Sequence, residues 1–276
     1  TDPASVEPRL ASYRRFASVI STTANAFFPS SNVMDSPTPQ KTRRIELKYQ
    51  VSHELARSLR DWAAIHMQPD EYAAHSPDCV YQITSLYLDT PEYDIYHRQS
   101  DRVRGKFRLR RYGTESTIWL ERKRKSGNVV RKRRTAISQK EVEKLIDADE
   151  GRTTTATEKP EQWFRELIQQ HQLQPVNIIS YRRFAAVGQS DYGPVRFTID
   201  DRIHSQPANG WHIPQGMAPT SDLLPGEQIV ELKFMDVLPP LFRQLLMDYP
   251  ISATGFSKYR TGVSHQLLPA ASDQLP

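Results

Sequence analysis

The sequence predicts an α+β protein: an eight-stranded antiparallel β-barrel with helices packed on its outside. Between residues 41 and 262, about eight segments alternate apolar with charged or polar residues, which is the period-two pattern of a strand. Tight turns join several of these segments directly, and the order of elements is not the regular strand–helix alternation of a parallel sheet. Most of the predicted strands carry one charged face and one apolar face.

Composition sets outer limits on the kind of protein. The chain has 276 residues, of which 38% are hydrophobic and 25% charged, and this length suits one large domain. No stretch approaches the about 20 apolar residues that a membrane helix requires, so we expect no membrane span. Its one cysteine, Cys79, excludes an internal disulfide framework and a cysteine-rich zinc site. The first residues lack the pattern of a signal peptide, and we therefore expect a cytoplasmic protein.

Three regions differ in composition. Residues 1–40 are rich in Pro, Ser and Thr and are predicted to form an N-terminal arm and linker with one short amphipathic helix. Residues 41–265 contain the predicted strands and form the main domain. Residues 266–276 are a polar C-terminal tail.

The elements of the main domain follow from periodicity and capping signals. Apolar residues alternate from Ile45 to Val51, and Ser52 then caps a predicted helix that reaches Ile65. Ser138 and Glu141 form a capping box at the start of another short helix. Further helices are expected at 93–96, at 161–171 and from Pro240 to Leu246. The remaining strands are expected at 80–88, 102–112, 117–125, 129–137, 175–188, 194–203 and 227–234, with a long loop at 205–226.

Positive charge is concentrated in one part of the chain. The formal net charge is +5, yet residues 102–134 contain 14 Lys or Arg and only two acids, Glu115 and Glu121. The rest of the chain is therefore net negative. Such an asymmetry indicates a polyanionic partner, either nucleic acid, an anionic surface or a phosphate chain.

The charged residues share strand faces. In a strand, residues two apart point to the same side, so Arg108 lies beside Arg110, and Glu231 beside Lys233. A sheet that closes around these faces would have a cationic interior, and buried like charges require a counter-ion. Triphosphate or polyphosphate suits an interior of Arg and Lys. An ordinary sandwich with its polar faces in water would explain the alternation, but not the excess of positive charge.

Several segments, in order, resemble the vacuolar transporter chaperone (VTC) domain, the polyphosphate polymerase branch of the CYTH-like triphosphate tunnel metalloenzymes. The resemblance covers about residues 43–262. The segments are Arg44-Ile45-Glu46-Leu47-Lys48-Tyr49, Ser85-Leu86-Tyr87-Leu88-Asp89-Thr90, Phe107-Arg108-Leu109-Arg110-Arg111-Tyr112-Gly113, Trp119-Leu120-Glu121-Arg122-Lys123, Val130-Arg131-Lys132, Tyr181-Arg182-Arg183, Val195-Arg196-Phe197-Thr198-Ile199-Asp200, Val230-Glu231-Leu232-Lys233 and Phe256-Ser257-Lys258-Tyr259.

This resemblance implies a tunnel in which a metal-dependent enzyme transfers the terminal phosphoryl group of ATP to a growing inorganic polyphosphate chain. The implied cofactor is Mn²⁺ or Mg²⁺, and the implied ligands are ATP or triphosphate and polyphosphate. The phosphate-binding cations by motif position are Lys48, Arg108, Arg110, Lys123, Lys132, Arg183, Arg196 and Lys258. Ser257, Lys233 and Tyr181 are expected to contact substrate as well. Glu231 is the expected metal ligand, and Glu46 is either a second one or the partner of a neighbouring cation.

Two positions depart from the family pattern. Arg44 stands where the wider superfamily has an acid, and Gly255 stands where eukaryotic polymerases have a lysine. Arg44 argues against the simple triphosphatase branch and against a two-metal site, and Gly255 leaves open a module that binds polyphosphate without catalysis. The alternatives to a polymerase are therefore a tunnel triphosphatase and a non-catalytic polyphosphate-binding module. Nucleic acid is not expected as a partner, because few aromatic residues interleave the basic run.

Overall fold

In the computed structural model, the described residues are 43–99, 102–126, 129–147, 160–216 and 222–267. The predicted arm at 1–40, the hairpin tip at 127–128 and most of the polar tail lie outside these ranges. Nine strands form one sheet. Their bounds are β1 Arg44–Ser52, β2 Gln68–Pro69, β3 Val80–Asp89, β4 Lys106–Tyr112, β5 Thr117–Ser126, β6 Val129–Ser138, β7 Gln174–Ser190, β8 Gly193–Pro207 and β9 Glu227–Met235.

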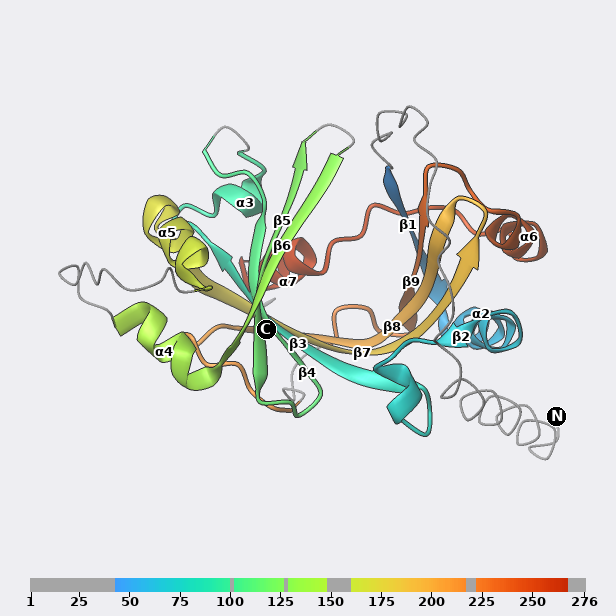
Figure 1. Cartoon of the computed structure of the whole chain (residues 1–276), viewed down its shortest axis with the longest axis horizontal. Helices are drawn as coiled ribbons and strands as arrows, with labels where there is room; N and C mark the ends of the chain where they lie inside the picture. Colours follow the sequence, from blue (N-terminus) through green and yellow to red (C-terminus); the bar gives the residue numbers. More distant parts are fainter. Residues whose placement is uncertain (1–42, 100–101, 127–128, 148–159, 217–221, 268–276) are drawn as a thin grey trace, which may run out of the picture.

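The sheet is antiparallel and strongly curved, as Figure 1 shows. Its strand order is β1-β9-β8-β7-β3-β4-β5-β6, and the short β2 pairs with β7 outside this path. The register shifts at Tyr87/Leu88 and again between Ser180 and Arg182, and such irregularities bend a sheet. The predicted α+β class and the antiparallel pairing are thereby confirmed.

The predicted closure into an eight-stranded barrel is not formed by hydrogen bonds. Within the described residues, no ladder joins β6 to β1, the two ends of the sheet. Side chains connect the two halves instead, because Lys123 Nζ on β5 lies 2.7 Å from Glu46 Oε2 on β1. Long charged side chains that meet in this way keep the two backbones too far apart to pair.

The structure has six helices in its described part. Their bounds are α2 His53–His66, α3 Asp94–His97, α4 Gln139–Asp147, α5 Gln162–His171, α6 Pro240–Asp248 and α7 Lys258–Leu267, with a 3₁₀ turn at Ala73–His75. Of these, α4 and α5 form one group and α2 and α6 another on the apolar outer face of the sheet (Figure 1). Leu59 of α2 and Phe242 of α6 pack on Phe197 and Leu232 in one core. A larger core includes Val142 of α4, Phe164 of α5 and the apolar residues of β3, β4 and β5.

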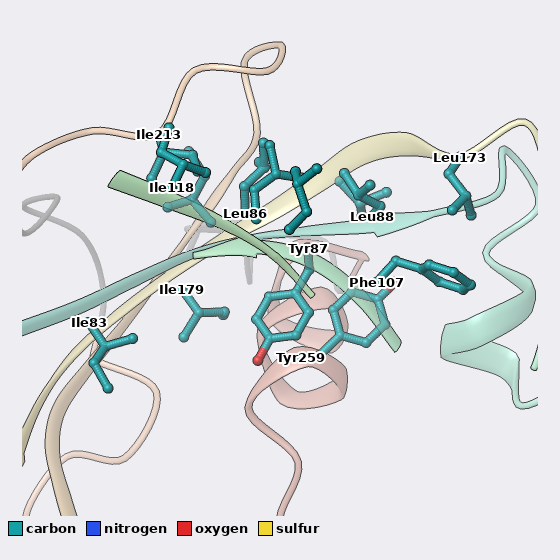
Figure 2. Packing of buried hydrophobic residues seen from close by; sticks show 14 of the residues in the cluster. Ile83, Leu86, Tyr87, Leu88, Phe107, Ile118, Leu173, Ile179, Ile213 and Tyr259 are labelled. Carbon is teal, nitrogen blue, oxygen red and sulfur yellow. The ribbon is translucent and has the colours of Figure 1, made fainter. Parts of the chain in front are cut away.

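Helix α7 lies on the other side of the sheet, within its curve (Figure 1). Figure 2 shows Leu86, Leu88 and Ile118 on one side of the strands and Tyr87 and Ile179 on the other. Tyr259 of α7 stacks on Tyr87 at 5.2 Å between ring centroids. The Tyr259 hydroxyl also bonds to the carboxylate of Asp89, the residue that ends β3.

The same Asp89 carboxylate accepts hydrogen bonds from the backbone N–H groups of Thr90, Ile95 and Tyr96. It is fully buried, so it holds α3 and α7 against the end of β3. This contact fixes where α7 begins, and α7 carries part of the candidate site.

The sequence does not predict helix α7 or the short strand β2. The other helices and strands agree with the expectations except at their ends. Ser52 Oγ caps α2, and Ser138 and Glu141 form the reciprocal capping box. The strand expected from residue 102 begins only at Lys106, because Gly105 has φ of +132° and breaks the extended backbone. Strand β8 continues to Pro207, into the segment expected to be a loop.

The packing of α7 depends on Gly262. A Cβ at this position would lie 2.6 Å from both Ile179 Cδ1 and Ser205 Oγ. We expect Gly262→Ala to lower the free energy of unfolding by about 1–3 kcal/mol, because the helix must move away from β7 and β8. Urea denaturation followed by circular dichroism measures the change.

Gly255→Ala is the matched control, since a Cβ added to Gly255 would have no atom within 4 Å among the described residues. It should change the free energy of unfolding by no more than about 0.5 kcal/mol. Equal stability of the two variants would show that α7 is not packed as described.

Candidate functional site

The sheet face that is turned toward α7 carries the charged side chains, and we call it the inner face. It gathers at least nine cations from the strands and the start of α7. These are Lys48, Lys106, Arg108, Arg110, Lys123, Lys132, Arg183, Lys233 and Lys258. The carboxylates that bond to them are Glu46, Glu121, Asp200 and Glu231.

Asp200 of β8 binds two of these cations on the inner face. Arg183 Nε and Nη2 donate to its two oxygens at 2.6 and 2.8 Å, and Lys258 Nζ donates at 2.6 Å. Burial alone would raise the pKa of Asp200, but the charges of Arg183 and Lys258 outweigh it and hold the pKa well below its usual range. Asp200 therefore carries a full negative charge and positions two predicted phosphate-binding cations.

Glu121 of β5 plays the same part for the β4–β5–β6 region. Arg108 Nη2 and Lys132 Nζ each lie 2.6 Å from its oxygens, and the Glu121 side chain is 2% exposed. Burial would raise the pKa of Glu121, yet the nearby cations, with Arg108 first, keep it far below the usual value. These contacts make Glu121 an internal partner of the cations.

Arg110 is held by neutral groups. Its Nε donates to Ser85 Oγ at 3.0 Å, and its Nη2 donates to the Tyr181 hydroxyl at 3.2 Å. Lys258 Nζ lies 4.7 Å from the centre of the Tyr181 ring. Tyr181, a predicted substrate contact, therefore also orients two of the cations.

Tyr87 is a further member of this network. Arg108 Nη1 donates to its hydroxyl at 3.2 Å. Burial would raise the pKa of Tyr87, but the charges of Arg108, Arg110 and Lys106 lower it to about 7. Cations stabilise the ionised phenol, so a lowered pKa at a buried tyrosine indicates an excess of positive charge on the inner face.

Strands β1 and β9 bring the two predicted metal-binding acids to the same face. Glu46 lies opposite Lys233, and Lys48 lies opposite Glu231. Glu231 pairs with Lys233 at 2.8 Å, while Glu46 pairs with Lys123. Lys48 Nζ donates to the carbonyl of Phe256 at 3.4 Å.

Arg196 of β8 lies opposite Lys233 of β9 in the strand register, on the same face of the sheet as the other predicted cations. Its guanidinium bonds to Asp70 and to the Tyr81 hydroxyl, at the β2 end of the sheet. Asp70 lies in a segment to which the sequence assigns no role. No local sequence pattern predicts that Arg196 pairs with Asp70, because 126 residues separate them in the chain.

Lys106 is absent from the predicted site, although the structure places it there. Its Nζ donates to Ser257 Oγ at 3.0 Å, which brings β4 next to the start of α7. The sequence does indicate this position, because alternate residues of a strand point to the same side and Lys106 alternates with Arg108 and Arg110. Ser257 also accepts from the backbone N–H of Arg260, so it caps α7 on the inner face.

The donor set permits a divalent cation only together with phosphate oxygens. Among the described residues, no group of three or more His, Cys, Asp or Glu is close enough to hold a metal. Glu231 is ionised, because the charges of Lys233, Lys48 and Arg183 outweigh burial and lower its pKa well below the usual value. Mg²⁺ commonly takes one or two carboxylates and completes its shell with substrate phosphates and water. Glu231 and Glu46 fit that arrangement.

The fold and this face define a class of protein: a curved antiparallel sheet around a cationic interior, with helices outside. The chain belongs to the VTC domain family, because the family model for the VTC domain matches residues 43–266. No curated protein shows significant sequence similarity to it. No helix among the described residues is long and apolar enough to cross a membrane.

Solved structures with a similar chain path are distant in sequence. A proposed adenylate cyclase from Bacillus halodurans is 16% identical, with a TM-score of 0.45, and the match covers 79% of this chain and 96% of that one. A proposed adenylyl cyclase from Hippeastrum, described as having a dominant triphosphatase activity, is 16% identical with a TM-score of 0.44, over 83% and 98% of the two chains. A Pyrococcus horikoshii protein is 12% identical with a TM-score of 0.44, over 80% and 99%.

The pairing of Asp200 predicts a pH-dependent stability. Asp200→Asn leaves Arg183 and Lys258 without their counter-charge, so we expect a loss of about 3–5 kcal/mol at pH 7. The folded pKa of Asp200 lies below its unfolded value of about 3.9, so the charged form contributes fully above about pH 5. At pH 3 the difference between wild type and variant should be smaller by about 1 kcal/mol.

Urea denaturation at both pH values measures this difference. Asp201→Asn is the control, because Asp201 pairs with Arg182 in a partly exposed ion pair. The control should lose about 1 kcal/mol or less. An Asp200→Asn effect that is equal at pH 7 and pH 3 would contradict the assignment.

Proposed function

We propose that this protein is a polyphosphate polymerase, which transfers the terminal phosphoryl group of ATP to the end of an inorganic polyphosphate chain. The observation that carries the proposal is the charge balance of the inner face, where at least nine cations meet four paired carboxylates in the described part of the chain. A multivalent anion is the ligand that would neutralise this excess. Membership of the VTC domain family supports the same interpretation.

The arginines suit the phosphate groups of such a ligand. Arg108 and Arg110 lie two residues apart on β4 and present planar guanidinium groups to one side. Lys106, Lys48 and Lys258 would add point charges around them. The N-terminus of α7, capped by Ser257, adds backbone N–H groups that favour an anion.

Phosphoryl transfer requires little from the protein beyond this arrangement. The transferred group carries its charge on its outer oxygens, and catalysis consists mainly of positioning and electrostatic stabilisation. A face of lysines and arginines provides both, and no covalent nucleophile is needed. Glu231 and Glu46 would hold a divalent cation, which supplies further positive charge at the phosphates.

A triphosphatase would use the same cations and differ only in the acceptor, which is water in place of a phosphate chain. Incubation of the purified protein with ATP and Mn²⁺ separates these functions. A polymerase forms ADP and a polyphosphate ladder on a stained gel. ADP or inorganic phosphate without the ladder would identify a hydrolase, and no turnover would identify a binding module.

The role of Glu231 gives a second prediction. Glu231→Gln keeps the size of the side chain but removes its charge, so turnover with ATP and Mn²⁺ should fall at least about 100-fold while the circular dichroism spectrum is retained. Glu227→Gln is the control on the same strand, because Glu227 is exposed and bonds to Gln50. Full activity of Glu231→Gln would remove this carboxylate from the site.

Anion binding should also stabilise the fold. A ligand that binds only the folded protein adds about 2.7 kcal/mol at a hundredfold excess over Kd, which corresponds to several degrees in Tm. We expect tripolyphosphate to raise Tm in this range, and chloride at equal ionic strength to have little effect. Differential scanning fluorimetry measures the shift.

Arg108→Ala should reduce the tripolyphosphate shift by at least half, because one bidentate phosphate contact is lost. Glu121 keeps Lys132 as its partner in this variant, so the fold should persist. Arg57→Ala, an exposed position on α2, is the control. An unchanged shift in Arg108→Ala would exclude this arginine from the anion site.

A further inference from the structure

A second basic surface lies on the outside of the sheet, where α5 crosses the β5–β6 hairpin. A groove of about 610 Å³ opens there between the helix and the two strands. We call it the outer groove. It is lined by Arg122, Arg124, Arg131, Lys132, Arg133, Trp163, Glu166, Leu167 and Gln170.

Four arginines form a two-by-two array in this groove. The strand register places Arg122 opposite Arg133 and Arg124 opposite Arg131. Like charges directly opposite one another destabilise a sheet, so this arrangement carries an energetic cost. Within the described residues, none of the four forms an ion pair with an acid.

Two of these arginines are held in place by aromatic rings. Arg133 lies 4.4 Å from the centre of the Trp163 ring, and Arg122 lies 5.3 Å from that of Phe107. The Nε atoms of Arg122 and Arg124 are buried and have no hydrogen-bond partner among the described residues. Arg122 Nη2 also donates to the carbonyl of Arg104 at 3.4 Å, so the groove holds at least two guanidinium groups in fixed positions.

The outer groove connects with the inner face through one residue. Lys132 lines the groove, and its Nζ also lies 2.6 Å from Glu121 Oε1 of the inner network. Strand β6 is the last strand of the sheet path, and no further strand lies beside it in the described part of the chain. In the described part of the chain, the edge of β6 is therefore where an extended ligand would pass from one face of the hairpin to the other.

We propose that the outer groove binds inorganic polyphosphate, as a continuation of the chain that occupies the inner face. Guanidinium groups two residues apart on one strand are about 7 Å apart, which allows a flexible phosphate chain to reach each in turn. The choice of polyphosphate as the ligand rests on the proposed function. Binding of polyphosphate in the groove does not itself require polymerase activity.

Nucleic acid fits the groove less well. Proteins that bind single strands use exposed aromatic faces to stack the bases. Trp163 is only 7% exposed, its ring is covered by Arg133, and its indole nitrogen donates to Thr135. The groove thus offers charge without a stacking platform.

The test compares a long polyphosphate with tripolyphosphate by isothermal titration calorimetry at two salt concentrations. The variant is Arg124→Gln with Arg131→Gln, since neither side chain takes part in the aromatic contacts that hold Arg122 and Arg133. The matched control removes two exposed arginines from α2 and α6, as Arg57→Gln with Arg243→Gln. Poly-glutamate and single-stranded RNA of equal charge are titrated in parallel.

We expect the groove variant to bind the long chain at least about tenfold more weakly than wild type. The slope of log K against log salt concentration should fall by roughly one to two, because two arginine–phosphate contacts are lost. Its affinity for tripolyphosphate should stay within about twofold, and the control should behave as wild type. Unchanged long-chain affinity in the groove variant would overturn the proposal. Equal or tighter binding of poly-glutamate or RNA through the same arginines would also overturn it.

The outcome is separate from that of the proposed function. Glu231 lies outside the groove, so Glu231→Gln should keep the long-chain binding that depends on Arg124 and Arg131 even where turnover is lost. If the wild-type protein shows no polymerase activity, the proposed function is refuted. If the groove variant still binds the long chain more weakly than that wild type, the proposal that the outer groove binds polyphosphate is supported.

Discussion

Electrostatic repulsion on the inner face is the constraint on which the rest of the structure depends. At least nine cations converge there, and each of the four carboxylates named among them is ion-paired. Buried charges of one sign raise the free energy of the folded state, so the apolar outer face must supply the compensating stability. The two cores supply it: one lies under α2 and α6, and the larger one lies under α4 and α5 and also includes Tyr259 of α7. The remaining positive charge is what makes the face a candidate anion site.

Two buried aspartates position the elements that carry these cations. Asp89 anchors α3 and Tyr259, and thereby sets the position at which α7 starts. Asp200 then holds Lys258, the first residue of α7, next to Arg183 of β7. The site is therefore built by a helix that the sheet binds through carboxylates, and loss of either acid would disturb the cations that these contacts position.

The two faces of the β5–β6 hairpin divide the basic run of the sequence between two surfaces. Lys123 and Lys132 point to the inner face and pair with acids there. Arg122 and Arg133 point outward, opposite each other, and line the outer groove. The alternation of charged residues along both strands explains why one short run contributes to both surfaces.

The sequence by itself determined the strand pattern, the charged faces and the family, because period two assigns every second residue to one side of a sheet. It thus identified Arg108 and Arg110 as neighbours on a face, and it also contained the signal for Lys106. The tertiary structure alone decided which acid pairs with which cation, as for Arg196 with Asp70 and Lys123 with Glu46. It also decided that hydrogen bonds do not close the described sheet. These contacts join residues far apart in the chain, and their distances depend on how the whole sheet curves, which no local pattern encodes.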